Sequence, residues 1–437
     1  MKFNQICVLG LGYIGLPTAS TFATYGVKVV GVDVNPSILA TLRRGELHIQ
    51  EPGLGEALQA AIQTGNLTLN EKPVEADAFI IAVPTPFFDD KFGEYNGQTY
   101  KLADMRAVAS ATEAIVPVLR KGNLVVLEST SPPRTTADLV TPILEKSGLK
   151  AGRDFFLAYS PERVLPGQIL RELIENARVI GGVTPESAAA GRDLYAVFVQ
   201  GQIVTTDATT AEMVKLMENT YRDVNIAIAN EFSRLADRFG VDVWEAIAIA
   251  NLHPRVKILR PGPGVGGHCI SVDPWFFVET APDLATLIYN ARRVNDGQPH
   301  YSLSLVEKAL GGSIKGEKIA ALGLAFKEDV DDLRESPAVE LAALMQKEGA
   351  QVKAFEPNKP DATFDAFPTV PTLAAALTDA DALVLLVGNR PFRELDPLKV
   401  AAQTPARVVV DMRGVLDRKA WRSAGFRVLT LGVGSDR

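Results

Sequence analysis

The sequence predicts an α/β protein in which two doubly wound sheets of parallel strands are joined by a long central helix. Three observations lead to this prediction. A strand pattern near the N-terminus ends in the glycine turn Gly10-Leu11-Gly12-Tyr13-Ile14-Gly15, residues 209–240 carry apolar side chains at helical spacing without a proline, and a second series of strand and helix patterns starts after Gly311-Gly312. A chain of 437 residues exceeds the size of one compact core, so we expect several domains.

The N-terminal pattern is that of a Rossmann-like dinucleotide-binding domain. Residues 6–9 form an apolar strand, and residues 16–24 after the turn have helical spacing. In such a turn Gly10 permits the tight bend, Gly12 lets a pyrophosphate approach the backbone, and Gly15 lets the helix pack against the strand. A strand over 27–32 ends at Asp33, whose carboxylate can accept hydrogen bonds from an adenosine ribose, which favours NAD over NADP. The predicted NAD contacts here are Gly10, Gly12, Tyr13, Ile14, Gly15 and Asp33.

Two further buried strands end in loops that we expect to border the cofactor. Residues 78–83 lead into Pro84-Thr85-Pro86, and residues 124–127 lead into Glu128-Ser129-Thr130. Ligands of open α/β sheets bind at the carboxyl ends of the strands, so Pro84, Thr85 and Thr130 join the predicted NAD contacts. Ordinary turn chemistry would explain either loop taken alone. Residues 87–100 are polar and aromatic and contain glycine, and we expect a mobile loop there.

The central stretch 209–240 is predicted to be one long helix. Lys215 and Asn219 are four residues apart and lie on one face of it, although a solvated helix face also explains such a pair. Strand patterns over 318–323, 351–355, 383–387 and 408–411, with a helix over 336–348, indicate a second Rossmann-like domain that lacks a full GxGxxG turn. Two such halves suit an enzyme that moves a hydride to NAD from a substrate that itself carries a nucleotide.

Residues 262–274 form a glycine-dense segment that contains Cys269, with His268 before it and Asp273 four residues after it. The glycines allow the backbone to pass close to a bulky ligand and leave the thiol in an open loop, which is typical of a nucleophile. A small buried hydrophobic side chain beside a turn is the alternative interpretation of this cysteine.

Composition and charge argue against several classes of protein. A formal charge of -7 without a Lys/Arg run argues against nucleic acid as a partner, and no apolar run reaches the roughly 18 to 20 residues of a membrane span. The N-terminus lacks a signal-peptide pattern, and two cysteines, Cys7 and Cys269, give no disulfide framework. We therefore expect a cytoplasmic protein, and we expect no metal site.

Several motifs occur in the order found in a known enzyme family. They are the turn at 10–15, the runs 83–86, 128–130, 160–167, 215–219 and 264–273, and the runs 323–327 and 331–338. On these motifs the chain resembles the UDP-glucose/GDP-mannose dehydrogenase family, the NAD-dependent UDP-sugar 6-dehydrogenases, over nearly its whole length. Val272 stands where the UDP-glucose enzymes usually carry lysine, and residues 251–259 and 272–276 resemble the branch that oxidises UDP-N-acetyl-D-mannosamine. The alternative is the branch that acts on UDP-N-acetyl-D-glucosamine, or another UDP-hexose 6-dehydrogenase.

The resemblance implies a four-electron oxidation of the sugar at C6. The alcohol becomes an aldehyde, Cys269 adds to it as a thiohemiacetal, a second oxidation gives a thioester, and water hydrolyses the thioester. A one-step dehydrogenase with a structural Cys269 and a non-catalytic nucleotide-sugar sensor are the competing interpretations. The resemblance assigns the oxyanion to Lys215 and Asn219, proton transfer to Asp273, the hydrolytic water to Thr130, and hydrolysis or substrate positioning to Glu162.

The resemblance also implies a UDP-sugar site, an assembly state and a domain division. Arg255, Lys327 and Arg334 are cations suited to the diphosphate, and His268 is expected to pack or to donate a hydrogen bond beside the nucleophile. A homodimer or larger homo-oligomer through the central helix, serving polysaccharide biosynthesis, is expected. The expected domains are 1–205 for NAD, 206–305 for the central helices, cysteine loop and dimer interface, and 306–437 for the UDP-sugar. The expected substrate contacts are Glu162, Arg163, Val164, Lys215, Asn219, Arg255, Gly266, His268, Lys327 and Arg334.

Overall fold

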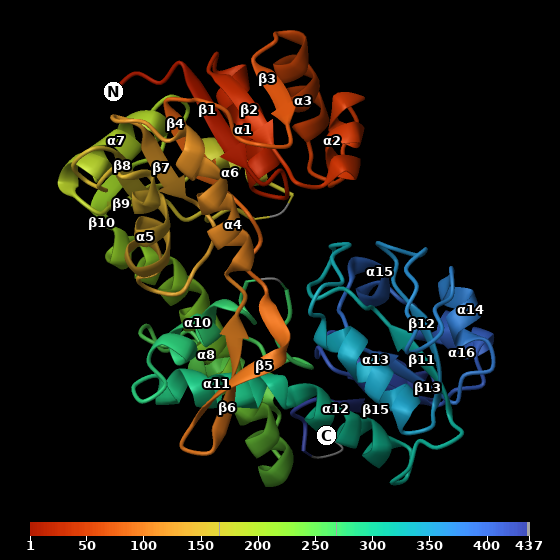
Figure 1. Cartoon of the computed structure of the whole chain (residues 1–437). Coiled ribbons are helices and arrows are strands. Elements are labelled where there is room, and N and C mark those ends of the chain that lie inside the picture. The colour runs from red at the N-terminus through yellow and green to blue at the C-terminus, as the bar shows by residue number, and fades with distance from the viewer. Residues whose placement is uncertain (166, 268, 435–437) are drawn as a thin grey trace. The chain divides into compact units, whose positions relative to one another are not determined.

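The computed structural model describes residues 1–165, 167–267 and 269–434. The chain folds into two compact units, the first made of Met1–Glu218 with Phe276–Leu284 and the second of Asn219–Trp275 with Ala285–Arg437. Two helices, α8 (Ala208–Phe239) and α10 (Asp273–Thr280), contain residues of both units. The long helix predicted over 209–240 is confirmed by α8 (Figure 1).

The described residues of the first unit form an eight-stranded sheet in the order β10-β9-β8-β7-β4-β1-β2-β3. Neighbouring strands are parallel except β8 and β9, which pair antiparallel. Its strands are β1 (Gln5–Leu9), β2 (Lys28–Val32), β3 (Leu67–Asn70), β4 (Ala78–Ile81), β7 (Leu124–Leu127), β8 (Phe156–Tyr159), β9 (Arg178–Gly182) and β10 (Ile203–Asp207). Its helices include α1 (Gly15–Thr24), α2 (Pro36–Arg43), α3 (Leu54–Gln63), α4 (Arg106–Ile115), α5 (Thr141–Leu144), α6 (Ile169–Glu175) and α7 (Pro185–Tyr195).

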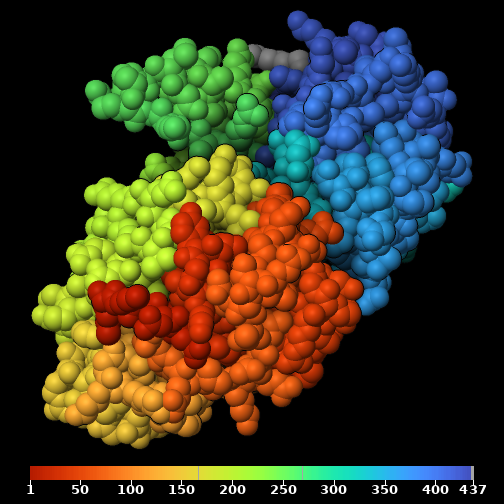
Figure 2. All heavy atoms as spheres, turned by 90° about the horizontal axis from the view of Figure 1, so that it is seen from above, coloured from red at the N-terminus to blue at the C-terminus, as the bar shows by residue number. Residues whose placement is uncertain are grey.

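Successive residues of β1 point to opposite faces of this sheet, and both faces are covered. Ile6 and Val8 belong to a buried cluster that includes Leu16 of α1, whereas Cys7 and Leu9 belong to a second cluster that includes residues of α4. A strand buried on both faces is apolar at successive positions, which explains the continuous apolar run in the sequence. The doubly wound arrangement is therefore confirmed for this unit, whose residues 1–218 are coloured red to yellow-green in Figure 2.

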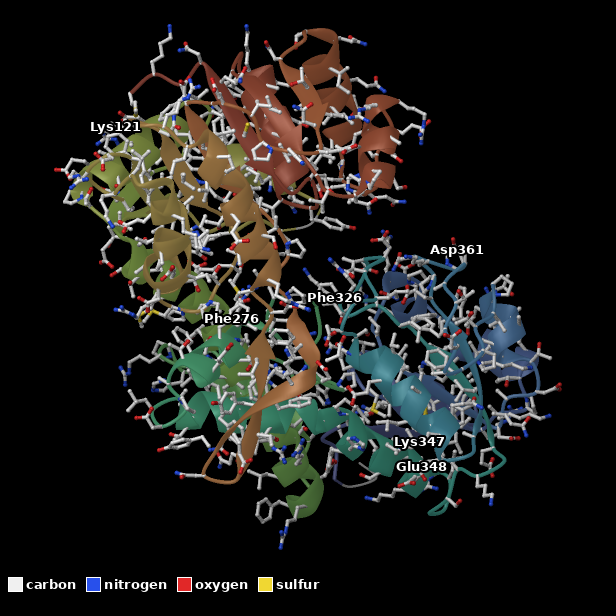
Figure 3. The ribbon with its side chains drawn as sticks, viewed as in Figure 1. Lys121, Phe276, Phe326, Lys347, Glu348 and Asp361 are labelled. Carbon is white, nitrogen blue, oxygen red and sulfur yellow. The ribbon has the colours of Figure 1, made fainter. Side chains whose placement is uncertain are left out.

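Residues 87–103 form a two-stranded antiparallel hairpin, so the prediction of a loop over 87–100 was wrong. Strands β5 (Phe87–Tyr95) and β6 (Gln98–Ala103) are joined by Asn96-Gly97, and both turn residues have positive φ. Two-residue hairpin turns favour Asn-Gly because both central positions need positive φ, so the sequence carried the signal. The hairpin packs within the first unit, where the ring centroid of Phe87 lies 5.7 Å from that of Phe276. Figure 3 labels Phe276.

The second unit contains a five-stranded parallel sheet, within the part of the chain that the structure describes, in the order β12-β11-β13-β14-β15. Its strands are β11 (Lys318–Leu322), β12 (Gln351–Phe355), β13 (Ala382–Leu385), β14 (Val408–Asp411) and β15 (Arg427–Thr430). Its helices include α9 (Val243–Ala250), α11 (Thr286–Asp296), α12 (Gln298–Ala309), α13 (Pro337–Lys347), α14 (Leu373–Leu377), α15 (Arg390–Arg393), α16 (Pro397–Gln403) and α17 (Arg418–Ser423).

This second sheet is also buried on both faces. Ile319 of β11 belongs to a cluster with Met345 of α13, whereas the next residue, Ala320, belongs to a cluster with Trp421 of α17. The prediction of a second Rossmann-like domain is therefore confirmed. Among the described residues, the helices are either too short or too polar to cross a bilayer.

Candidate active site

The turn after β1 is tightly packed at Gly10 and Gly15 and open at Gly12, which lies between them. Gly10 has a φ of +89°, and a Cβ there would lie 2.5 Å from the Ala82 carbonyl oxygen. A Cβ on Gly15 would lie 1.8 Å from the Gly10 carbonyl oxygen, whereas a Cβ on Gly12 would meet no described atom within 4 Å. The turn therefore requires glycine for its own geometry at two positions and leaves room for a ligand at Gly12, as a pyrophosphate site needs.

Asp33 follows β2 and is half-buried beside this turn. Its Oδ2 accepts a hydrogen bond from the Leu11 N–H at 3.0 Å, and its Oδ1 accepts one from the Asn35 N–H at 2.9 Å. Helix α1 follows Tyr13 and Ile14, and no described side chain caps its first N–H groups. These N–H groups and the partial positive charge of the helix end suit a bound phosphate.

His48 was not among the residues predicted from the sequence. Burial lowers the pKa of His48, and the nearby Asp33 carboxylate acts in the opposite direction. The charge of the acid that we predicted to bind the ribose therefore acts on this imidazole. Nothing in the local sequence indicates this interaction, because residues 34–47 separate the two side chains along the chain.

The loops after β4 and β7 are joined to each other. The Thr85 hydroxyl donates to the Thr130 carbonyl oxygen at 2.7 Å, and the Ser129 hydroxyl donates to the Val83 carbonyl oxygen at 2.7 Å. Thr85 is buried, Thr130 is half-buried, and Pro84 is exposed. The structure thus brings together the two loops that were predicted to border the cofactor.

A buried charge cluster lies among the residues that follow β7 and β8. Glu128 accepts hydrogen bonds from the Arg178 guanidinium and from the Tyr195 hydroxyl, the latter at 2.8 Å. Arg178 also donates from Nη1 to Glu162 at 2.8 Å. Burial raises the pKa of Glu128 to about 7, against the opposing effect of Arg178. Glu162, predicted to act in hydrolysis, is therefore paired with an arginine that the sequence analysis did not single out.

Arg163 and Val164 follow Glu162 in the same loop. The Arg163 N–H donates to the Glu162 carboxylate at 2.7 Å, and the Arg163 guanidinium pairs with Glu218 and donates to the Ala177 carbonyl oxygen. Val164 packs against the buried cluster around α1. All three side chains have partners inside the first unit, and their predicted contacts with substrate stay predictions.

Cys269 is exposed just before α10 in the second unit. Its carbonyl oxygen accepts the Asp273 N–H at 2.9 Å, which forms the turn that starts the helix. The buried Asp273 carboxylate accepts a hydrogen bond from Asn219 Nδ2, and Asn219 Oδ1 accepts one from Arg222. The structure therefore connects two predicted catalytic residues, Asn219 and Asp273, directly and joins both to the Cys269 segment.

The glycines before Cys269 pack against residues 326–337 of the same unit. A Cβ on Gly266 would lie 2.4 Å from the Glu335 carbonyl oxygen, and one on Gly267 would lie 2.8 Å from the Phe326 ring, which Figure 3 labels. The Gly267 N–H also donates to the Arg334 carbonyl oxygen at 3.3 Å. The sequence analysis expected these glycines to admit a ligand, and here they admit a second segment of the protein.

The predicted phosphate-binding cations are exposed. Arg255 and Lys327 are exposed, and Arg334 makes a bidentate pair with Asp332 at 2.9 and 2.7 Å. Lys215, by contrast, is 8% exposed on α8. His268 lies outside the described residues. Among the residues that the structure describes, no group of three or more His, Cys, Asp or Glu side chains is placed to hold a metal ion.

Three parts of the chain match the domains of one enzyme family. Residues 4–199 match the NAD binding domain of the UDP-glucose/GDP-mannose dehydrogenase family, residues 209–297 its central domain, and residues 320–418 its UDP binding domain. The chain belongs to the UDP-glucose/GDP-mannose dehydrogenase family. The resemblance drawn from the sequence motifs is therefore confirmed.

Individual relatives cover nearly the whole chain. The UDP-N-acetyl-D-mannosamine dehydrogenase of Methanococcus maripaludis strain C7 is 45% identical over 437 residues, which are 99% of this chain and 98% of the relative. The NDP-N-acetyl-D-galactosaminuronic acid dehydrogenase of Ralstonia solanacearum is 47% identical and covers 96% of this chain and 98% of its own length. The solved structure of the UDP-D-ManNAc dehydrogenase from Pyrococcus horikoshii is similar with a TM-score of 0.88 at 38% identity, covering 98% of this chain and 99% of that one.

Membership of this dehydrogenase family gives each half of the chain a role. The protein is an NAD-dependent UDP-sugar dehydrogenase, and the prediction of NAD as cofactor is confirmed. The glycine turn and Asp33 belong to the part that matches the NAD binding domain, and Lys327 and Arg334 belong to the part that matches the UDP binding domain.

Proposed function

We propose that this dehydrogenase oxidises UDP-N-acetyl-D-mannosamine at C6 to UDP-N-acetyl-D-mannosaminuronate. One alcohol, two NAD⁺ and one water yield one carboxylate, two NADH and three protons. Two of the reported relatives support this sugar by their names, the methanococcal enzyme at 45% identity over 99% of the chain and the structure from Pyrococcus horikoshii, whereas the Ralstonia relative is named for a galactosaminuronic acid. The observation that carries the reaction type is the exposed Cys269, whose backbone carbonyl oxygen accepts the N–H of Asp273 in the Asn219–Asp273 pair, because the second oxidation needs a covalent adduct of the aldehyde.

The first unit fits NAD. The open space at Gly12 and the N-terminus of α1 suit the pyrophosphate, and Asp33 suits the ribose hydroxyls. Bound NAD supplies the acceptor for the hydride that leaves C6 in each oxidation. The residues that we assign to NAD are Gly10, Gly12, Tyr13, Ile14, Gly15, Asp33, Pro84, Thr85 and Thr130.

Cys269 is the nucleophile of the proposed reaction. Its thiolate adds to the aldehyde carbon and forms a thiohemiacetal, and loss of the second hydride from C6 leaves a thioester. Water then adds to the thioester carbon, the carbon–sulfur bond breaks, and the carboxylate leaves with the thiolate restored. Lys215 and Asn219 stabilise the oxyanions in these steps, since a cation and an amide donor act strongly where water is excluded.

Asp273, Thr130 and Glu162 act on the water and the protons. Asp273 accepts the proton of the attacking water, and its hydrogen bond from Asn219 keeps the carboxylate oriented. Thr130 holds the water, and Glu162 assists hydrolysis or positions the sugar. Arg178 and the Arg163 N–H both donate to Glu162, so its carboxylate is held in one orientation.

The diphosphate is bound by exposed cations in this proposal. Arg255, Lys327 and Arg334 supply the positive charge, and the guanidinium groups suit bidentate contact with phosphate oxygens. The remaining substrate contacts that we propose are Glu162, Arg163, Val164, Lys215, Asn219, Gly266 and His268.

We propose a homodimer or larger assembly through α8. Tyr221, Ile228, Phe232 and Leu235 lie along this helix and are 40 to 66% exposed, which is unusual for a row of large apolar side chains unless a second surface covers it. Light scattering of the purified protein should give at least twice the 47.0 kDa chain mass. The domain ranges 1–205, 206–305 and 306–437, the cytoplasmic location and the role in polysaccharide biosynthesis stay predictions.

The proposed reaction is tested by counting NADH per sugar. Purified protein is incubated with limiting UDP-N-acetyl-D-mannosamine, UDP-N-acetyl-D-glucosamine or UDP-N-acetyl-D-galactosamine, and NADH is read at 340 nm. Two NADH per mannosamine substrate are expected. Two NADH from either of the other sugars only would reassign the substrate, and one NADH per sugar would refute the thioester route.

A pair of cysteine variants tests the nucleophile. Cys269→Ser should lower the rate of acid formation by roughly 10³-fold or more, because an alcohol is a poor nucleophile without an activating base. Cys7→Ala is the matched control, since Cys7 is buried in β1 and, among the residues that the structure describes, its thiol bonds only to the Val74 carbonyl oxygen. Equal acid formation by Cys269→Ser and the parent enzyme would remove Cys269 from the mechanism.

A further inference from the structure

We propose that Asn230 is a positioning residue for the Cys269 segment, acting through its hydrogen bond to the backbone of Gly262. Asn230 lies on α8 with its side chain fully buried, and its Oδ1 accepts the Gly262 N–H at 3.0 Å. Gly262 is the first residue of the glycine-dense segment 262–274 that carries the nucleophile. This inference rests on the proposed function of Cys269 and extends it to a residue that no sequence motif singled out.

The neighbours of Asn230 fix which way its amide points. Its Nδ2 donates to Asn295 Oδ1 at 2.9 Å, and Asn295 Nδ2 donates to Asp223 Oδ1 at 2.8 Å and to the Asp223 carbonyl oxygen at 3.0 Å. An acceptor at Asp223 requires the NH₂ group of Asn295 on that side, so the Asn295 oxygen faces Asn230. Asn230 must then present its NH₂ group to Asn295 and its oxygen to the Gly262 N–H.

This series of hydrogen bonds starts at a buried ion pair. Arg292 Nη1 donates to Asp223 Oδ1 at 2.6 Å, and Arg292 also pairs with Asp296. Burial raises the pKa of Asp223, and the Arg292 guanidinium acts in the opposite direction. Asp223 Oδ1 therefore accepts from both Arg292 and Asn295. Every link from Arg292 to Gly262 has a defined donor and a defined acceptor, and a flipped amide would place two donors or two acceptors face to face.

The Cys269 segment is consequently held by α8 near both of its ends. Asn219 donates to Asp273 at the C-terminal end, and Asn230 accepts from Gly262 at the N-terminal end. The two asparagines are separated by about three helical turns, or roughly 16 Å along the axis, and lie on the same face of the helix. Between them, the Gly267 N–H donates to the Arg334 carbonyl oxygen. Loss of the Asn230 contact would release one end of the segment while the Asn219 contact remains.

The test is Asn230→Ala, with Asn225→Ala as the matched control. Asn225 lies on the same helix, and within the described part of the chain its amide donates only to the Tyr221 carbonyl oxygen of that helix. We expect Asn230→Ala to lower kcat by roughly 10- to 100-fold, the effect of a displacement of about 1 Å at a reacting group. The KM for NAD should not change, because the contact lies outside the part that matches the NAD binding domain. Asn225→Ala should stay within about twofold of the parent in both parameters.

A second readout reports the position of the thiol without catalysis. Cys7 is fully buried, so iodoacetamide should alkylate Cys269 alone in the native protein. Asn230→Ala should change this alkylation rate by about threefold or more, and Asn295→Ala should change it in the same direction but less, because it frees only the orientation of Asn230. A folded Asn230→Ala protein with the alkylation rate and kcat of the parent would overturn the proposal.

Hydrogen exchange of the unmodified protein covers the case in which Asn230→Ala does not fold. The Gly262 amide should exchange at least about tenfold more slowly than the amides of Gly264 and Gly266, and fast exchange at Gly262 would overturn the proposal. Alkylation and exchange do not depend on any substrate. If no UDP-sugar is oxidised, the proposed function fails while these two measurements still decide the placement of the segment.

Discussion

The turn after β1 and the turn after β11 have the same backbone geometry. Gly10 has a φ of +89° and donates its N–H to the Val32 carbonyl oxygen at 2.8 Å. Gly323 has a φ of +91° and donates to the Phe355 carbonyl oxygen at 2.9 Å. In both halves, the N–H of the glycine donates to the last residue of one neighbouring strand, β2 or β12. A Cβ on the glycine would collide with residues that follow the other neighbouring strand, β4 or β13. The first strand of each sheet is thus followed by a turn in which glycine has the same conformation and the same type of hydrogen bond.

The two halves differ in two respects: the burial of the acidic residue beside this turn, and the length of the segment between the turn and the next helix. Asp33 is half-buried and accepts from two backbone N–H groups, whereas Glu356 is 2% exposed and accepts from Leu324, Ala325, Asn358 and Asn389. In the first half, α1 starts at the third glycine of the turn, while in the second half residues 324–336 intervene before α13. The first half therefore offers a helix end to a ligand. The second half uses its acid internally to fix a longer loop that carries Lys327 and Arg334.

Among the substitutions that test this difference, we expect Gly15→Ala to have the largest effect on the free energy of unfolding and on NAD binding. The new Cβ would lie 1.8 Å from the Gly10 carbonyl oxygen, so the turn and α1 must separate, at a cost of about 3 kcal/mol or more in the free energy of unfolding. NAD binding should be lost with it. Thermal unfolding and NAD titration measure both effects.

Two other glycine variants complete this first comparison. Gly12→Ala meets no described atom within 4 Å, so it should leave the melting temperature within a few degrees of the parent and weaken NAD by about tenfold or more. Gly323→Ala should destabilise the protein through its φ of +91° and leave NAD affinity unchanged. Unaltered stability of Gly15→Ala would show that the close packing of the first turn is not required.

The second comparison exchanges each acid for its amide. Glu356→Gln places an NH₂ group against N–H donors in a buried site, so we expect a loss of about 2 kcal/mol in the free energy of unfolding with NAD affinity unchanged. Asp33→Asn faces solvent on one side, so its stability loss should stay below about 1 kcal/mol, while NAD weakens about tenfold. Chemical denaturation and NAD titration separate the two outcomes. Equal stability losses at both positions would mean that the two acids have the same structural role.

Much of this fold could be predicted because its signals are local. The turn at Gly10, the strands on either side of it and the long helix α8 each appear as a pattern within about 30 residues, and all are confirmed. The hairpin at 87–103 also had a local signal in Asn96-Gly97, and it was missed because the run is polar on both faces and resembles a loop.

The buried polar contacts could not be predicted in the same way. Arg178 lies 50 residues from Glu128, and Asn230 lies 65 residues from Asn295. A single sequence shows which residues can form ion pairs and amide contacts, but the choice of partner depends on how strands and helices come together. For that reason Glu162 was predicted as a site residue while its partner Arg178 was not.

The last comparison concerns the acids at the ends of two corresponding strands, Glu128 after β7 and Asp411 in β14. Asp411 accepts four backbone N–H groups, whereas Glu128 depends on Arg178 and Tyr195. Burial raises the pKa of Glu128 to about 7, above its ordinary 4.5. Because burial raises the pKa of Glu128 in the folded state, the contribution of this carboxyl group to the free energy of unfolding is fully present below pH 4.5. This contribution is lost as the pH rises through 7, since the folded state resists ionisation of Glu128.

Glu128→Gln removes this titration and so tests it. Between about pH 5 and pH 8 the unfolding free energy of the parent should fall by roughly 2 kcal/mol relative to that of Glu128→Gln, with the steepest change at about pH 6, midway between the ordinary and the raised pKa of Glu128. Denaturant unfolding at several pH values measures the difference. A constant difference across this range would show that Arg178 keeps Glu128 ionised throughout it.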